Sequence, residues 1–228
     1  MHQNKGPVYY SQYLMLDKLL SAQEPLSRKY ASPEIPEAHD EMLFIVVHQS
    51  YEIWFKQMLH DLNSILDVFN QPIVQDQSFG MITNRLNRIT KIQRMILGYM
   101  DILETMTPME FLEFRNLLIP ASGFQSTQFR EIEIKLGLKT TDRESVDREF
   151  FLGRLSAKDK DILVKLESES SLFDLMEKWL ERTPYTNQNT FNFWEEYKKA
   201  IHNTLEQDRK TIETNAAGLT DENKKIQL

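Results

Sequence analysis

The 228-residue chain contains no cysteine. That absence excludes disulfides, thiol catalysis and thiolate ligation of haem or iron–sulfur clusters. Its seven glycines and eight prolines are few for a β-sandwich or a β-barrel, because those folds use turn residues often. No apolar run approaches the roughly 18 residues that a membrane-spanning helix needs, and the N-terminus has no signal-peptide core. We therefore expect a soluble, cytoplasmic protein with no membrane partner.

The chain also lacks an excess of positive charge. Its 27 basic and 34 acidic residues give a net charge of −7, whereas nucleic-acid-binding proteins usually carry a basic excess. We therefore expect no nucleic-acid partner. Among the five histidines, no two stand three or four residues apart, so none forms the paired face that binds a metal on a helix. The sequence predicts no metal ligand.

Apolar residues recur with helical periodicity through almost the whole chain. No alternating run of four or more residues predicts a strand. The segment 24–36 contains three prolines and predicts a surface connection. Helices are expected over about residues 10–20, 37–70, 79–106, 108–119, 125–136, 156–169, 171–182 and 190–215. The predicted fold is all-α, a multi-helix bundle of long helices in a single domain over residues 1–228, with a frayed tail at 220–228.

His48 is the first candidate functional residue. It lies in the apolar half of the helix expected over 37–70, where Phe44, Tyr51 and Phe55 share its face by i, i+3 and i+4 spacing. One interpretation is a core histidine whose hydrogen bonds are satisfied within the protein. The other is a neutral imidazole that lines an aromatic pocket and hydrogen-bonds a ligand N–H or hydroxyl.

Arg115 is the second candidate, because it falls inside a stretch, residues 111–118, that is too apolar to lie mostly in water. An ion pair with Glu113, or with a carboxylate across the core, would explain its position. A planar guanidinium that binds a ligand carboxylate would explain it equally. The Ser122-Gly123 loop that follows offers backbone N–H groups to an anion, although most such loops only turn the chain.

These features occur, in this order, within blocks that resemble tryptophan 2,3-dioxygenases, haem enzymes that open the indole ring with O₂. The blocks cover roughly residues 9 to 137, and several are long enough to be specific. They read YSQYL (10–14), LLSAQ (19–23), HDEMLFIVVHQ (39–49), LETMTP (103–108), FR (114–115) and PASGFQS (120–126). The resemblance implies an all-α homotetramer whose protomers interlock at the N-terminus. It also implies conversion of L-tryptophan and O₂ to N-formylkynurenine, the first step of the kynurenine route.

The resemblance further implies roles for the residues that match the family's substrate site. His48 would be the catalytic distal histidine that hydrogen-bonds the indole N–H. Arg115 would pair with the substrate carboxylate, and Phe44 would pack against the ring. The other matches are two pocket walls and two tyrosines lent by a neighbouring subunit, which are Phe111, Leu118, Tyr10 and Tyr13. L-Tryptophan needs an apolar slot for its ring, an acceptor for its N–H and a cation for its carboxylate.

The cofactor that the resemblance implies is haem. Ser122 and Gly123 match the loop at the haem edge, and Met100 falls where family members carry an aromatic residue near that edge. The family's proximal haem histidine lies in a later segment that we do not find here, and the surroundings of His202 do not match it. We therefore expect the N-terminal portion of a longer dioxygenase, which binds haem when complete. The alternative is a haem-less helical oligomer or small-molecule binder that retains only the distal pocket.

Overall fold

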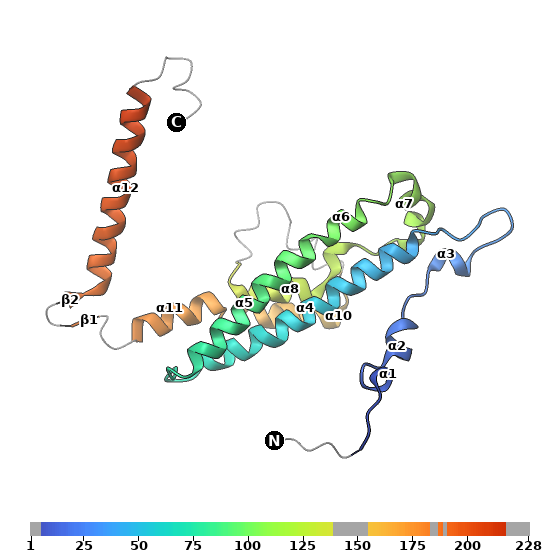
Figure 1. Cartoon of the computed structure of the whole chain (residues 1–228), viewed down its shortest axis with the longest axis horizontal. Helices are drawn as coiled ribbons and strands as arrows, with labels where there is room; N and C mark the ends of the chain where they lie inside the picture. The colour runs from blue at the N-terminus through green and yellow to red at the C-terminus, as the bar shows by residue number, and fades with distance from the viewer. Residues whose placement is uncertain (1–5, 139–154, 183–186, 189–190, 218–228) are drawn as a thin grey trace. The chain divides into compact units, whose positions relative to one another are not determined.

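The structure, a computed structural model, describes residues 6–138, 155–182, 187–188 and 191–217 (Figure 1). Helices make up almost all of its regular structure, which confirms the predicted all-α class. The described strands are two short pieces, β1 (Asn187–Gln188) and β2 (Phe191–Asn192), which pair antiparallel. Within the described ranges, no helix is long and apolar enough to cross a membrane.

The described helices vary from single turns to long rods. They are α1 (Tyr10–Tyr13), α2 (Leu16–Leu20), α3 (Leu26–Lys29), α4 (Glu41–Phe69), α5 (Ser78–Leu97), α6 (Tyr99–Leu103), α7 (Pro108–Arg115), α8 (Thr127–Leu136), α10 (Ala157–Glu167), α11 (Leu172–Arg182) and α12 (Phe193–Ala217). Two 3₁₀ turns, η1 (Asn116–Leu118) and η2 (Gly123–Gln125), lie between α7 and α8.

The chain divides into two compact units, Met1–Leu175 and Met176–Leu228, where the sequence predicted a single domain. Most side chains described on α12 are exposed, although the helix carries apolar residues at helical spacing. The single domain expected over residues 1–228 stays a prediction. The tail predicted at 220–228 lies outside the described residues.

The 29-residue helix α4 is the centre of the first unit, and it packs against both α5 and α8. Its second half is buried because apolar side chains recur there on more than one face. The buried apolar residues of α4 and α5 are Val47, Phe55, Met58, Leu59, Leu62, Ile65, Leu66, Phe69, Ile82, Ile89, Ile92 and Ile96. Asp61 is also buried, and Arg88 of α5 donates to it at 2.9 Å, so its charge is paired.

Several helix boundaries differ from those predicted. The helix expected over 10–20 is broken at Met15, which has a left-handed backbone with φ of 52°. The helix expected over 79–106 is interrupted at Gly98, whose N–H bonds to the Met95 carbonyl at 3.1 Å. The region 24–36 is not wholly irregular, because Pro25 occupies the N-cap of α3. Proline disrupts a helix interior but is compatible with a helix start.

The predicted start of α7 and the predicted end of α8 are confirmed, whereas α7 ends at Arg115 and gives way to the 3₁₀ turn η1 before residue 119. Thr107 and Glu110 form a capping box at the start of α7, with Pro108 in the first turn. Gly137 ends α8 with φ of 112°, and a Cβ there would lie 2.8 Å from that of Phe173. Both the left-handed conformation and the close approach therefore require glycine at this position.

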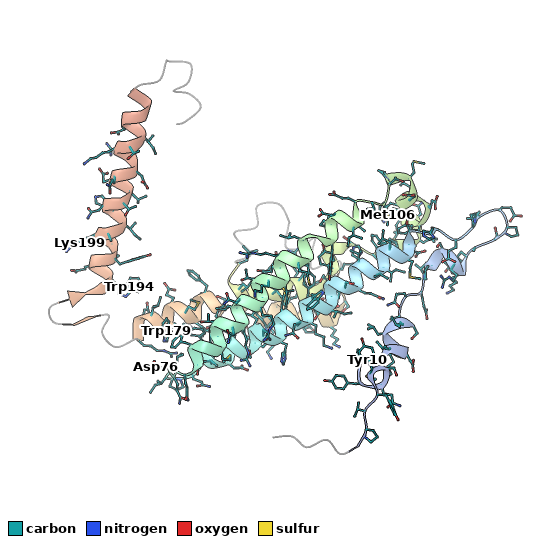
Figure 2. The ribbon with its side chains drawn as sticks, viewed as in Figure 1. Tyr10, Asp76, Met106, Trp179, Trp194 and Lys199 are labelled. Carbon is teal, nitrogen blue, oxygen red and sulfur yellow. The ribbon has the colours of Figure 1, made fainter. Side chains whose placement is uncertain are left out.

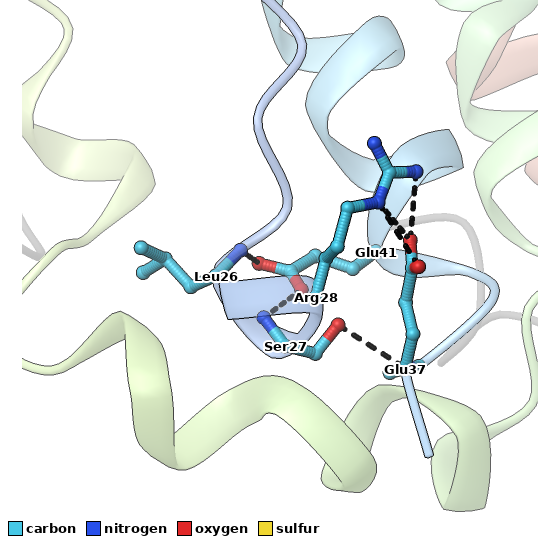
Figure 3. A network of polar contacts seen from close by, with 6 residues as sticks. Leu26, Ser27, Arg28, Glu37 and Glu41 are labelled. Carbon is cyan, nitrogen blue, oxygen red and sulfur yellow. Dashed lines mark hydrogen bonds and ion pairs between the residues drawn. The ribbon is translucent and has the colours of Figure 1, made fainter. Parts of the chain in front are cut away.

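A buried carboxylate joins α3 to the start of α4 (Figure 3). The Glu41 side chain is only 1% exposed, and it accepts hydrogen bonds from the backbone N–H groups of Leu26 and Ser27, both at 2.8 Å. These N–H groups are unpaired donors of the first turn of α3, so Glu41 caps that helix from a distance. The Ser27 hydroxyl accepts from the Ala38 N–H at 3.1 Å. These contacts hold residues 37–40 outside α4, which explains why it begins later than predicted.

Replacing Glu41 with alanine leaves two backbone donors without an acceptor. We expect the free energy of unfolding to fall by about 2–3 kcal/mol, measured by urea denaturation followed by circular dichroism. Arg28→Ala is the control, because it removes an exposed ion pair with Glu37 in the same region and should change little. Equal stability of the Glu41→Ala and Arg28→Ala variants would contradict this account.

Candidate functional site

A cavity of about 630 Å³ lies among α4, α7 and the segment that leads into α8. This volume is within the range of small-molecule pockets, roughly 300–1,000 Å³. Seven of the residues predicted to form the site line it, namely Phe44, His48, Phe111, Arg115, Leu118, Ser122 and Gly123. The structure thus brings together residues that are as much as 79 positions apart in the sequence.

Aromatic side chains of α4 and α7 form one wall of this cavity. The Phe44 ring lies 5.8 Å from the Phe111 ring and 5.6 Å from that of Phe114. Phe111 and Phe114 meet nearly edge to face, at 5.4 Å and 88°. Because Phe114 is fully buried, these contacts fix α7 against α4 and give the wall a defined shape.

The imidazole of His48 has a defined orientation. Its Nδ1 lies 2.7 Å from the backbone carbonyl oxygen of Phe44, and its ring centre lies 4.0 Å from that of Phe44, with the ring planes tilted by 33°. A carbonyl oxygen only accepts hydrogen bonds, so Nδ1 carries the proton. In the neutral imidazole, Nε2 is then the acceptor, and no described residue donates to it. The geometry leaves one imidazole acceptor available to a ligand in the cavity.

Arg115 ends α7 at the cavity with its side chain half-buried. Within the described part of the chain no carboxylate forms an ion pair with it, so the pair with Glu113 considered from the sequence is not formed. Its guanidinium carbon lies 6.0 Å from the centre of the Phe111 ring. A half-buried cation beside an aromatic wall is suited to bind a ligand carboxylate in two-point geometry.

The capping box also sets the direction in which α7 enters the site. Glu110 accepts from the Thr107 backbone N–H at 2.7 Å, and the Glu110 N–H donates to the Thr107 hydroxyl at 3.4 Å. The hydrogen bond from the Thr107 N–H is the main reason that the pKa of Glu110 is below its ordinary value. The carboxylate that anchors the start of α7 therefore stays ionised at neutral pH.

The Ser122-Gly123 loop is held by its own hydrogen bonds. The Ser122 N–H donates to the side-chain oxygen of Gln125 at 2.9 Å, so this N–H is not the free anion-binding group considered from the sequence. Gly123 lines the cavity, and a Cβ at this position would meet no atom within 4 Å. The missing side chain leaves space at this edge of the cavity.

Three predicted site residues do not line the cavity. Tyr10 and Tyr13, on α1, are 75% and 76% exposed, and Figure 2 shows where Tyr10 lies on this helix. Met100, on α6, is 46% exposed. The structure therefore gives Met100 no place in the cavity, and the assignment of the tyrosines to a neighbouring subunit's site stays a prediction.

Several residues that line the cavity were not predicted from the sequence, and Glu52 is the most notable of them. It follows His48 by four positions, so helical spacing alone could have placed it on the same face. Ala121, Gln125, Ser126 and Phe129 also line the cavity. Phe129 belongs to α8, and its ring lies 5.5 Å from that of Phe55. No local signal predicts a contact of this kind, because it depends on how α8 packs on α4.

Tyr51 also lines the cavity, although its hydroxyl is already engaged. It donates to the Ile96 carbonyl at 2.9 Å, and its ring meets that of Tyr99 at 5.4 Å. Burial, and secondarily Tyr99, raises the pKa of Tyr51. The Trp54 indole N–H donates to the Tyr99 hydroxyl at 2.8 Å. Tyr51 is thus a neutral, fixed wall residue.

The cavity offers one face for a planar group such as haem. Phe44, Tyr51, Phe55, Phe111 and Phe129 contribute aromatic rings to its walls, and the open space at Gly123 admits a flat edge. Over the described ranges, no three histidine or acidic side chains gather as a metal site. Among the described histidines, His48 lines the cavity, and its Nε2 is oriented to accept a hydrogen bond from a ligand N–H. The cavity residues therefore fit the distal side of a haem site, and no second described histidine lines the cavity to act as the proximal ligand.

Comparison with known proteins gives a match over nearly the whole chain. The sequence model of the family described as tryptophan 2,3-dioxygenase matches residues 1–227. The motif blocks that suggested this family cover only about residues 9–137, and the family match continues through the later helices.

Curated relatives show the same similarity. The tryptophan 2,3-dioxygenase of Alteromonas mediterranea is 49% identical over 214 residues, which cover 94% of this chain and 58% of the relative. That of Bdellovibrio bacteriovorus is 47% identical over 96% of this chain and 59% of the relative. That of Dictyostelium discoideum is 47% identical over 91% of this chain and 51% of the relative. The chain thus spans between half and three fifths of the length of these relatives.

The orientation of His48 predicts its tautomer. We expect ¹⁵N NMR of selectively labelled histidine to show the Nδ1–H form for His48, because Nδ1 donates to a backbone carbonyl. His60 is the comparison, since it lies exposed on the same helix and should show the Nε2–H form that predominates in water. A protonated Nε2 in neutral His48 would refute the acceptor role.

Proposed function

Because the chain belongs to the tryptophan 2,3-dioxygenase family, we propose that it forms the distal side of a haem dioxygenase site. The enzyme inserts O₂ across the indole 2,3 bond of L-tryptophan and gives N-formylkynurenine. One observation supports this most directly. The imidazole of His48, with a free acceptor, and the guanidinium of Arg115, without a carboxylate partner among the described residues, share one aromatic cavity.

The cavity complements each part of L-tryptophan. The apolar ring packs between Phe44 and the other aromatic walls, with Phe111 and Leu118 beside it. His48 Nε2 accepts the indole N–H, which sets the rotation of the ring. Arg115 binds the carboxylate with two parallel hydrogen bonds. With both polar ends of the substrate held, the 2,3 bond has a single orientation.

Haem, when bound, supplies the oxygen chemistry, and Ser122 and Gly123 would lie against its edge. This chain's residues orient the substrate and exclude water. The aromatic rings of Phe44, Phe111 and Phe129 line the cavity and would lie beside the indole. The same walls lower the local dielectric, which strengthens the contact of Arg115 with the substrate carboxylate.

We propose that the active form is a homotetramer in the cytoplasm. Tyr10 and Tyr13 support this proposal, because large aromatic side chains on a short, highly exposed helix are suited to bury themselves against another subunit. In that arrangement each protomer contributes its tyrosines to a neighbour's cavity. The reducing environment of the cytoplasm also agrees with a chain that uses no cysteine.

The activity itself is tested with the natural full-length polypeptide. We expect the haem-loaded protein, given L-tryptophan and air, to accumulate N-formylkynurenine, measured by its near-ultraviolet absorbance. The control is the same reaction without O₂. An intact, haem-loaded preparation that gives no product would reject the proposed activity. Binding of L-tryptophan without haem or turnover would instead indicate the haem-less binder.

Replacing Arg115 with leucine should weaken binding of L-tryptophan and leave haem in place. We expect KM to rise about 100-fold, which corresponds to the roughly 3 kcal/mol of a charge-assisted pair, with an unchanged Soret spectrum. Arg94→Leu is the matched control, because Arg94 is exposed on α5 and does not line the cavity. The carboxylate assignment would be wrong if Arg115→Leu kept the affinity of Arg94→Leu.

A further inference from the structure

Glu52 is a cavity residue to which the proposed function gives no role. It lies on α4 one turn beyond His48, half-buried, and its side chain lines the cavity. A half-buried carboxylate beside aromatic rings is costly unless it is hydrogen-bonded. Its partner comes from α8, where Gln128 lies in the first turn.

The contact between Glu52 and Gln128 has a fixed geometry. The Gln128 Nε2 donates to a Glu52 carboxylate oxygen at 2.7 Å and to the Glu52 backbone carbonyl at 2.9 Å. Both hydrogens of the amide nitrogen are thereby used, and both acceptors belong to one residue. Neither acceptor can donate, so the amide has one possible orientation. This two-point contact holds the start of α8 at a set position along α4.

The start of α8 is continuous with the loop at the edge of the cavity. Ser126 caps α8, with its hydroxyl accepting from the Phe129 N–H at 3.2 Å. The Gln125 N–H donates to the Ser122 carbonyl at 2.9 Å. Short-range hydrogen bonds therefore tie the Ser122-Gly123 loop to Gln125 and Ser126, and Ser126 to the first turn of α8. A movement of Gln128 relative to α4 would move the loop relative to His48.

We propose that Glu52 is a positioning residue that controls which indole rings the cavity admits, an inference that rests on the proposed function. Held by Gln128, it sets the spacing between the His48 imidazole on α4 and the Ser122-Gly123 loop. The substrate ring occupies that space. When the contact is lost, the loop and α8 shift relative to α4, and the cavity accepts a wider ring.

A second polar contact between the same two helices provides a matched control. Lys135, near the end of α8, donates to the side-chain oxygen of Asn63 on α4. Neither residue lines the cavity. Losing this contact also loosens α8 on α4, but away from the substrate. A general effect of helix packing would therefore appear equally in Lys135→Met.

The experiment compares L-tryptophan with an L-tryptophan that carries one methyl group on its benzo ring, using the haem-loaded full-length enzyme. We expect the wild type to prefer the unsubstituted substrate in kcat/KM by at least about tenfold, the usual effect of one extra methyl group in a fitted pocket. Glu52→Leu and Gln128→Leu should remove most of this preference. Glu52→Gln should retain it, since a glutamine oxygen still accepts from Gln128. Lys135→Met should retain it as well.

Each other outcome overturns the inference. A Glu52→Gln variant as permissive as Glu52→Leu would show that charge, and not the contact with Gln128, is what matters. Equal effects of Lys135→Met and Gln128→Leu would show a general packing effect. A wild type with no preference would show that the cavity does not select substrates by the width of their ring. If Glu52→Leu fails to fold, as judged by circular dichroism, the test rests on the substrate preference of Gln128→Leu compared with that of Lys135→Met. A wild type that converts neither substrate rejects the proposed function, whereas an active wild type with unaltered variants rejects this inference only.

Discussion

The contact between Phe114 and Phe44 determines the geometry of the site. Phe114 is fully buried, and its ring lies 5.6 Å from that of Phe44. One of these residues belongs to α7, which carries Arg115, and the other to α4, which carries His48. The distance between the guanidinium and the imidazole is therefore set by apolar packing and not by any direct bond between them. A close-packed contact between buried rings tolerates little movement. The His48 imidazole and the Arg115 guanidinium therefore keep their spacing without a ligand.

The polar groups of the site are held in ways that leave them free for a ligand. His48 is oriented by a backbone carbonyl of its own helix, and α7 is anchored by a capping box remote from the guanidinium of Arg115. Neither arrangement uses the atoms that face the cavity. Glu52 differs, since its carboxylate bonds to Gln128. The site thus combines two polar groups that are available to a ligand, those of His48 and Arg115, with one carboxylate, that of Glu52, which is bonded within the protein.

The sequence predicted much of the fold and the residues around the cavity, for identifiable reasons. Helical spacing places Phe44 and His48 on one face, and capping signals at Thr107 and Gly137 define helix ends within a few residues. The contact of Glu52 with Gln128 spans 76 positions, and no local pattern encodes it. Met100 was placed by resemblance alone, and the break of the helix at Gly98 could not be foreseen from periodicity.

The hydrogen bond between His48 and its own helix has a consequence for how the cavity can adapt. Because Nδ1 donates to the Phe44 carbonyl one turn earlier, the imidazole is oriented by α4 and by no described residue of another helix. A movement of α7 or α8 would therefore change the walls around Nε2 but not the direction in which that acceptor points.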